Sequence, residues 1–259
     1  MPKYFDVHSH LNASQYDADR EEVIQRMRES ETHTIVIGTD LESSQKAVEL
    51  AEKHEEIYAS IGIHPADDPS ASWEVYKFNK LISSKKVVAI GECGFDFYHA
   101  KKEEDYERQK KLFVDQIEFA IKYDKPLMIH ARPARLPSGG NAYEELLETL
   151  IEFKGIRGNI HFFAGSWDIA QKFFELGFTI SFTGVITFTH DYDEVIRNAP
   201  IDKILSETDA PLVAPVPYRG KRNEPSYVSE VVKRIAEIKG EDFEVVRVAL
   251  AQNGLRMIM

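Results

Sequence analysis

Cysteine is almost absent from this chain of 259 residues, which contains only Cys93. A single cysteine excludes an internal disulfide and any cysteine-based zinc cluster. Cys93 directly follows Glu92, so it could be read as a nucleophile, but neighbouring side chains on a strand point to opposite faces. We therefore interpret Cys93 as a small, partly buried residue and not as a catalytic thiol.

Positive charge is also scarce, because 32 Lys and Arg stand against 43 Asp and Glu, for a net charge of −11. This balance argues against a general basic surface that coats nucleic acid, although bound cations and a local Arg or Lys group could still hold a phosphate. No long apolar run resembles a membrane span. The start of the chain, MPKYFDVHSH, has no basic region followed by an apolar stretch. We expect a cytoplasmic protein that does not bind membranes, and we favour a monomer.

The chain does contain a regular alternation of apolar, strand-like runs and segments with helical spacing. The candidate strands are 4–9, 34–38, 57–63, 87–92, 126–130, 158–163, 178–182 and 203–206, and helical spacing is found in 19–29, 103–123, 142–153 and 225–238. Eight such units predict an α/β protein, a single-domain TIM (β/α)8 barrel over 1–259. A last helical stretch, 241–252, is expected to pack outside this barrel.

Five of the strand-like runs lead directly into residues of metal-ligand type. The runs are YFDVHSH, VVAIGECG, PLMIH, NIHFF and ILSETD, and they supply His8, His10, Glu92, His130, His161 and Asp209. One histidine at a strand end is more often satisfied by hydrogen bonds than by a metal. Four of them together with two carboxylates indicate a metal site. Imidazole and carboxylate donors suit Zn, Mn or Mg, in one or two ions per chain.

The distribution of these residues also bears on the fold. A doubly wound open sheet is the alternative, but it would gather ligands at a single switch point. Candidate ligands at the ends of strands 1, 4, 5, 6 and 8 favour a closed barrel, which brings all strand ends around one ring.

Two of the candidate ligands are predicted to take part in catalysis. Glu92 can bridge two metal ions about 3.5–4 Å apart with its two oxygens. Asp209 is expected to be a ligand and also the base that orients the attacking water, although the ETDAP context allows an N-cap as well. Asp96 could orient a histidine from behind or could simply be a turn residue, and we favour the orienting role.

The remaining histidines are interpreted differently. His33, His54 and His99 are expected in loops or helix ends facing solvent. His190 begins a helix-like stretch and is expected to cap it or to lie on the surface.

Seven segments in order resemble the TatD family of metal-dependent deoxyribonucleases in the amidohydrolase superfamily. They are HSH, SIGIHP, GECGFDFY, PLMIHAR, HFFAGS, SETDAP and RGKRNEPSYV, and they span essentially the whole chain. The resemblance implies a TIM barrel with one or two metals, held by His8, His10, Glu92, His130, His161 and Asp209. It also implies that His64 lines the site and that Arg132 binds substrate. The segment HARPARLPSGGNAY departs from the family pattern, with Pro133 in place of an acidic residue and Arg135 following.

Other substrate-binding candidates come from the residues themselves. The basic run that contains Arg219, Lys221 and Arg222 follows a ligand-bearing strand in an acidic chain, so Arg219 and Arg222 are predicted to bind phosphate. Tyr98, Trp167 and Tyr218 are weaker candidates for stacking on a base.

The leading function is therefore a metal-dependent hydrolase acting as a deoxyribonuclease, with 3′–5′ exonuclease action on single-stranded DNA. The alternative is hydrolysis of carbon esters or amides, such as D-aminoacyl-tRNA deacylation or another amidohydrolase activity. Two-metal amidohydrolases often carry a carbamylated lysine on strand 4, and Glu92 in its place favours the deoxyribonuclease. A non-enzymatic scaffold is disfavoured because the whole ligand set is intact.

Overall fold

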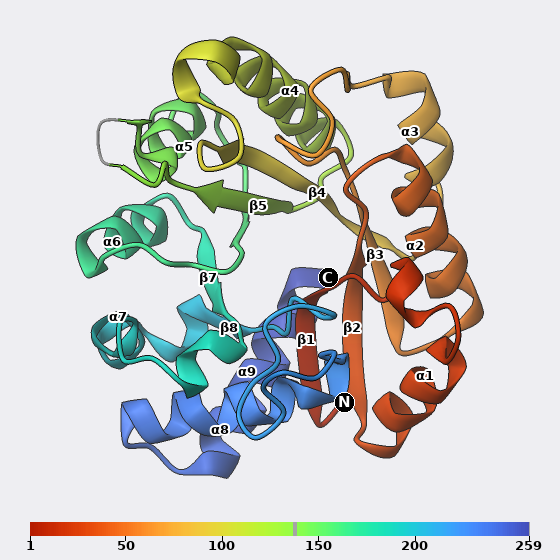
Figure 1. The fold of residues 1–259 in the computed structure, drawn as a ribbon, viewed down its shortest axis with the longest axis vertical. Coiled ribbons are helices and arrows are strands. Elements are labelled where there is room, and N and C mark those ends of the chain that lie inside the picture. Colours follow the sequence, from red (N-terminus) through yellow and green to blue (C-terminus); the bar gives the residue numbers. More distant parts are fainter. Residues whose placement is uncertain (137–138, 259) are drawn as a thin grey trace.

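The computed structural model describes residues 1–136 and 139–258, and its centre is one sheet of eight parallel strands in the order β1 to β8. The strands are β1 (Tyr4–Ser9), β2 (Thr32–Ile37), β3 (Ile57–Ile61), β4 (Val87–Asp96), β5 (Leu127–Arg132), β6 (Gly158–Ile160), β7 (Thr179–Phe182) and β8 (Ile204–Ser206). Figure 1 shows them arranged around a common centre with the helices outside. The predicted TIM barrel is confirmed.

The helices follow the strands in alternation, as a parallel sheet requires. They are α1 (Arg20–Glu29), α2 (Leu41–Lys53), α3 (Val75–Leu81), α4 (Lys102–Lys122), α5 (Ala142–Leu150), α6 (Trp167–Glu175), α7 (Asp193–Asn198), α8 (Val228–Lys239) and α9 (Phe243–Ile258). Within the described residues, no helix is long and apolar enough to cross a membrane. Apolar faces of the helices pack against the outer face of the strands to form the main core.

The barrel is closed between β1 and β8 by a short seam. An isolated parallel bridge joins Ser9 to Ala210, the His10 N–H donates to the Ala210 carbonyl at 2.7 Å, and the Asp209 N–H donates to the His8 carbonyl at 2.9 Å. These bonds place Asp209 beside His8 and His10, although Asp209 is about 200 residues from both histidines in the chain. Barrel closure therefore builds one wall of the site.

A second, smaller apolar cluster fills the barrel beneath the site. It contains Phe5, Val7, Ile35, Ile37, Val88, Met128 and Leu205. The end of α9 packs against it through Leu255, Met257 and Ile258, and Gly254 lies directly against the Phe5 side chain. Packing outside the barrel is expected for 241–252, and the residues of α9 that contact this inner cluster lie after that range.

Two histidines lie elsewhere than expected. His33 is on β2 and not in a loop, half-buried between the rings of Phe5 and Tyr58. His54 does end α2, but it is buried and its Nδ1 lies 2.8 Å from Arg28 Nη2. His190 is exposed and pairs with Asp193 at 3.0 Å, as expected of a residue at a helix start.

Candidate metal centre

The six candidate ligands come together at the end of the barrel where the strands finish. His8 is on β1 and His130 on β5. His10 and His161 directly follow β1 and β6, and Asp209 lies three residues after the end of β8. Glu92 does not end its strand, because β4 continues to Asp96. The β4–β5 register shifts between Ile90 and Cys93, and Gly91 has φ of +140°, which a side chain would strain. This irregularity lies immediately before Glu92.

Glu92 is at the centre of the group, and each of its oxygens faces a different set of histidines. Oε2 lies 3.4 Å from His8 Nε2 and 3.7 Å from His10 Nε2. Oε1 lies 2.8 Å from His130 Nδ1 and 2.9 Å from His161 Nε2. Two groups of three donors, each able to hold a metal ion, therefore share one carboxylate. This is the arrangement expected of a carboxylate that bridges two cations.

Asp209 completes the side of the site next to β1. Its Oδ1 lies 3.4 Å from His10 Nε2 and 3.7 Å from His8 Nε2. It has φ of +54°, a left-handed conformation that Asp adopts more readily than most residues. The side chain accordingly contributes to the cluster and does not cap a helix.

The charges in the cluster support one another. Burial by itself would raise the pKa of Glu92, but the neighbouring His161 and His8 and hydrogen bonds from His130 and His161 hold that pKa well below its usual range. Burial would lower the pKa of His161, yet the charges of Glu92 and Glu207 raise it well above the ordinary histidine value. Glu92 is thus ionised, as a metal ligand must be.

The donor set fits divalent cations of the Zn, Mn or Mg type. Imidazole nitrogens and carboxylate oxygens are their usual protein ligands. The buried Nδ1 of His8 has no hydrogen-bond partner among the described residues, whereas its Nε2 faces Glu92 and Asp209.

Outer contacts hold two of the histidines. Asp96 Oδ2 lies 3.1 Å from His130 Nε2, so the orienting position favoured from the sequence is the one that the structure shows. The other contact involves Glu207, which sequence reasoning missed. Its Oε1 lies 3.4 Å from His161 Nδ1, and its carboxylate accepts hydrogen bonds at 2.6 Å from the Phe162 N–H and the Ser181 hydroxyl.

Glu207 could have been noticed in the sequence. It is fully buried and follows β8 directly, two residues before Asp209. Like the other candidate ligands, Glu207 stands at the end of an apolar strand, and the segment SETD contains two such acidic residues, Glu207 and Asp209.

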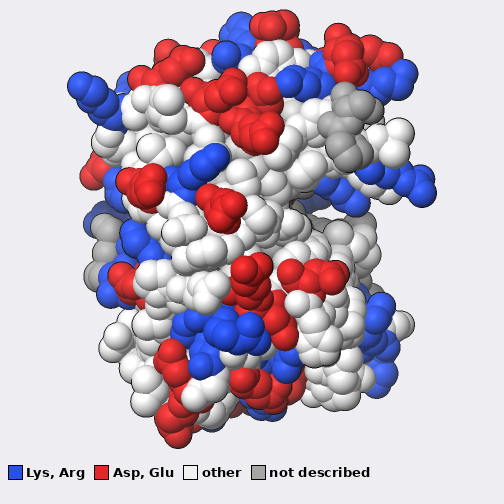
Figure 2. All heavy atoms as spheres, turned by 90° about the vertical axis from the view of Figure 1, so that its left-hand side faces the viewer, with Lys and Arg blue, Asp and Glu red and all other residues white. Residues whose placement is uncertain are grey.

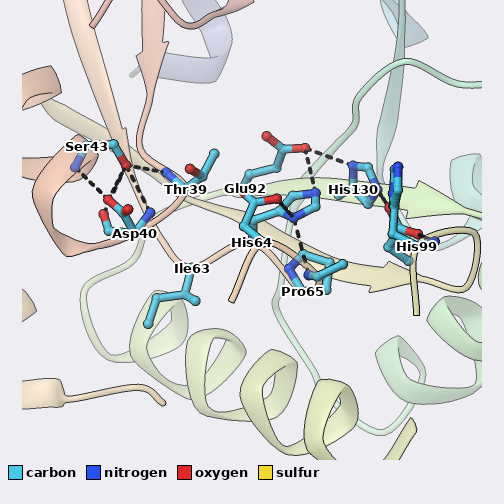
Figure 3. Close-up of polar contacts among 12 residues, drawn as sticks. Thr39, Asp40, Ser43, Ile63, His64, Pro65, Glu92, His99 and His130 are labelled. Carbon is cyan, nitrogen blue, oxygen red and sulfur yellow. Dashed lines mark hydrogen bonds and ion pairs between the residues drawn. The ribbon is translucent and has the colours of Figure 1, made fainter. Parts of the chain in front are cut away.

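A cavity of about 1000 Å³ opens over the cluster. His64 lines it, as the resemblance implied, and so does Arg132, whose substrate binding stays a prediction; His64 Nε2 is 3.8 Å from Glu92 Oε1. Figure 3 shows His64 and His130 both pointing toward the Glu92 carboxylate. His99, expected to face solvent, is half-exposed but also lines the cavity and pairs with Asp96 at 2.8 Å.

The predicted basic loop is placed differently. Neither Arg219 nor Arg222 lines the cavity. Arg222 forms two hydrogen bonds with Asp19, at 2.8 and 2.6 Å, and Arg219 stacks on the Phe188 ring at 3.6 Å. Of the aromatic candidates, Tyr218 stacks on Tyr227, and Trp167 begins α6 and packs toward the core. The structure therefore does not bring this loop's charges to the metal centre.

The barrel, its donor cluster and the cavity define a class, the metal-dependent hydrolases built at the mouth of a TIM barrel. Comparison with known proteins identifies the family. Residues 5–258 match the family described as TatD related DNase, and the chain belongs to that family.

Individual relatives agree with this assignment. The chain is 39% identical to the metal-dependent hydrolase YabD of Bacillus subtilis over 98% of each chain. It is 30% identical to the metal-dependent hydrolase YcfH of Escherichia coli, over 97% of this chain and 94% of YcfH. The crystal structure of YjjV, a TatD homolog from Escherichia coli, superposes with a TM-score of 0.88 at 27% identity, covering 99% of this chain and 98% of YjjV. The protein is a metal-dependent hydrolase of the TatD family.

Proposed function

We propose that this chain is a deoxyribonuclease that hydrolyses phosphodiester bonds from the 3′ end of single-stranded DNA, with one or two Mg, Mn or Zn ions. The observation that supports this most directly is the division of Glu92 between two pairs of histidines, Oε2 toward His8 and His10 and Oε1 toward His130 and His161. When bound, such ions lower the pKa of water toward neutrality and neutralise charge that develops on phosphoryl oxygens.

The residues of the chain have separate tasks in this reaction. Asp209 is buried at the edge of the cluster with a pKa below its usual range, because hydrogen bonding to His10 and the charge of His8 outweigh its burial. It is therefore an ionised carboxylate beside both first-strand histidines and is suited to orient the attacking water and accept its proton. Asp96 and Glu207 keep His130 and His161 in place from behind.

The cavity suits a nucleotide unit and a short stretch of backbone. Its volume of about 1000 Å³ is at the upper end of ordinary ligand sites. On the face of the protein in Figure 2, Lys and Arg lie interleaved with Asp and Glu and form no extended basic region. Contacts to DNA are therefore proposed to be local, inside this cavity, and not spread over this face.

The proposal is tested with the purified protein and a panel of substrates and metals. Single-stranded DNA, duplex DNA, RNA and D-aminoacyl-tRNA are incubated with Mg, Mn or Zn, and with chelator as the blank. We expect metal-dependent release of mononucleotides from the 3′ end of single-stranded DNA. Blocking the 3′ end while leaving the 5′ end free should abolish this release.

Two results would contradict the proposal in different ways. Rapid deacylation of D-aminoacyl-tRNA with no cleavage of DNA would assign the site to carbon esters. Cleavage of DNA from the 5′ end, or internally, would support phosphodiester hydrolysis but contradict the proposed action from the 3′ end. A Glu92→Gln variant serves as the matched control for contaminating nucleases, because it removes the shared carboxylate with almost no change in shape.

A further inference from the structure

A second polar group lies beside the metal centre and takes no part in holding metal in the proposed reaction. It consists of Tyr98 and His99, in the loop after β4, and Arg132 at the end of β5. The Arg132 guanidinium stacks on the Tyr98 ring at 4.2 Å, and the Tyr98 and His99 rings are 5.1 Å apart. The backbone of Arg132 lies opposite that of Asp96 where β5 runs beside β4. Both His99 and Arg132 line the cavity.

His99 is held in one orientation by Asp96. Its Nδ1 lies 2.8 Å from Asp96 Oδ2, and its backbone N–H donates to Oδ1 at 2.8 Å. Figure 3 shows the His99 ring next to His130, on the side away from Glu92. The carboxylate can only accept from Nδ1, so Nε2 is the nitrogen left to meet a ligand.

Among residues 1–136 and 139–258, no carboxylate lies within ion-pair distance of the Arg132 guanidinium. Arg222, by contrast, forms an ion pair with Asp19. Stacking on Tyr98 fixes the plane of the Arg132 guanidinium, and a fixed planar guanidinium presents two N–H groups to a phosphate.

Acidic side chains line another part of the cavity and give it negative charge. Asp40, Glu42 and Asp67 line it, and Lys46 on that side is paired with Glu42 at 2.8 Å. A polyanionic strand would be repelled there and attracted toward Arg132 and His99. Only Asp96 and His130 stand between His99 and Glu92, so this second group is the immediate neighbour of the metal centre.

We propose that His99 and Arg132 form a phosphate subsite, which binds the DNA phosphate next to the one that is cleaved. The proposal rests on the proposed function and deepens it, because it states where the strand that remains after cleavage is held. It also assigns His99 as a substrate-binding residue. For an enzyme acting from the 3′ end, the phosphate bound here is the second from that end.

The test removes the charge from that phosphate and from the protein in turn. The substrate is a single-stranded oligonucleotide with one neutral methylphosphonate at the second linkage from the 3′ end, compared with the all-phosphate oligonucleotide. In the wild type, kcat/KM for release of the first nucleotide should fall roughly tenfold, the scale of one charge-assisted hydrogen bond. In the double variant His99→Gln, Arg132→Gln, kcat/KM should be low for both substrates and nearly equal between them.

A matched control is available in His190→Gln. His190 is also an exposed histidine paired with an aspartate three residues away, but it lies outside the cavity. This variant should retain the full effect of the methylphosphonate. Metal content, measured by elemental analysis, should be unchanged in all three proteins, which separates loss of phosphate binding from loss of metal.

Binding measured without cleavage distinguishes this inference from the proposed function. Affinity for the same oligonucleotides is determined with Ca²⁺ in place of the catalytic ion. If the wild type binds DNA through His99 and Arg132 but cleaves none, the subsite stands and the nuclease activity is wrong. If the wild type cleaves DNA and the methylphosphonate lowers kcat/KM equally in wild type and double variant, the subsite is wrong and the nuclease stands. Neither binding nor cleavage of DNA would overturn both.

Discussion

The donor cluster at the barrel mouth and the β1–β8 seam beside it can be compared through one buried carboxyl group each, Glu92 and Asp6, whose pKa values are shifted in opposite directions. Glu92 faces four imidazoles at 2.8–3.7 Å, and its pKa lies well below the usual range in spite of burial. Asp6 is equally buried, and burial raises its pKa well above the ordinary value. Its neighbours are the Thr208 N–H and hydroxyl, at 2.8 and 2.7 Å, and the Thr34 hydroxyl at 3.2 Å.

The difference shows that burial alone does not decide the charge of a group in this barrel. Neutral donors compensate the charge of Asp6 less than cationic donors would, so burial keeps its pKa above the ordinary value while its hydrogen bonds tie β1, β2 and β8 together. Cationic donors around Glu92 compensate its charge, and divalent ions can do so in their place. The seam is thus suited to hold the barrel closed, and the cluster is suited to hold metal.

The largest effect is expected from Glu92→Gln, which replaces the carboxylate at the centre of the cluster with a neutral amide. Loss of an outer partner of a metal ligand costs roughly 10- to 100-fold in affinity or activity, so loss of the shared ligand should exceed that range. Metal content and hydrolysis should both fall by more than a hundredfold. Elemental analysis and the single-stranded DNA assay measure them, and full activity with Mg or Mn would show that Glu92 is not a shared ligand.

A smaller effect is expected from Glu207→Gln, which leaves every proposed ligand in place. The amide keeps the shape but weakens the hold on His161 Nδ1 and can no longer accept through both oxygens. Metal affinity should fall by about 10- to 100-fold. Titration with Zn in a competition assay measures it, with Glu42→Gln at the rim as control. Unaltered affinity would mean that Glu207 supports only the Phe162 and Ser181 contacts.

The seam is tested through the pH dependence of stability. Because the folded protein raises the pKa of Asp6, its contribution to stability is complete below the ordinary Asp pKa and is lost as pH rises through the raised value. Asp6→Asn should remove this loss, so its free energy of unfolding should decline less above about pH 4. Urea denaturation at several pH values, with chelator present, measures the slope. A steeper decline in the variant would show that Asp6 is ionised in the fold.

The smallest effect is expected outside both regions, at Arg222. Its ion pair with Asp19 is partly exposed, and such pairs contribute about 0–1 kcal/mol. Arg222→Ala should change the free energy of unfolding by no more than that and should leave KM for DNA unchanged. The matched variant Arg132→Ala should raise KM. A rise in KM with Arg222→Ala would show that the loop between β8 and α8 does bind the DNA substrate.

Much of the fold and of the cluster could be predicted from local patterns. A parallel strand buried on both faces reads as an apolar run, and a polar residue at its end reaches the barrel mouth whatever the neighbouring loops do. This is why His8, His10, His130, His161 and Asp209 could be selected without a structure, and why the structure finds them together. The same logic placed the end of β4 four residues early, because the strand continues past the irregularity at Gly91.

Side-chain partners far apart in the sequence could not be predicted in this way. Nothing in the basic run shows that Arg222 pairs with Asp19, about 200 residues earlier, and nothing around Arg132 shows that it has no such partner in the described part of the chain. Likewise, His33 and His54 gave no local sign of their burial, because the rings and the arginine that surround them come from other elements.

The sequence by itself determined the alternation of strands and helices, the barrel and the residues of metal-ligand type, because each depends on spacing along one segment. The tertiary structure alone decided that Glu92 stands between two pairs of histidines, that Glu207 supports His161, and that His99 and Arg132 share a wall of the cavity. The physical reason is that charge and hydrogen bonding act through space over a few ångströms. In a closed barrel those few ångströms join residues from opposite ends of the chain.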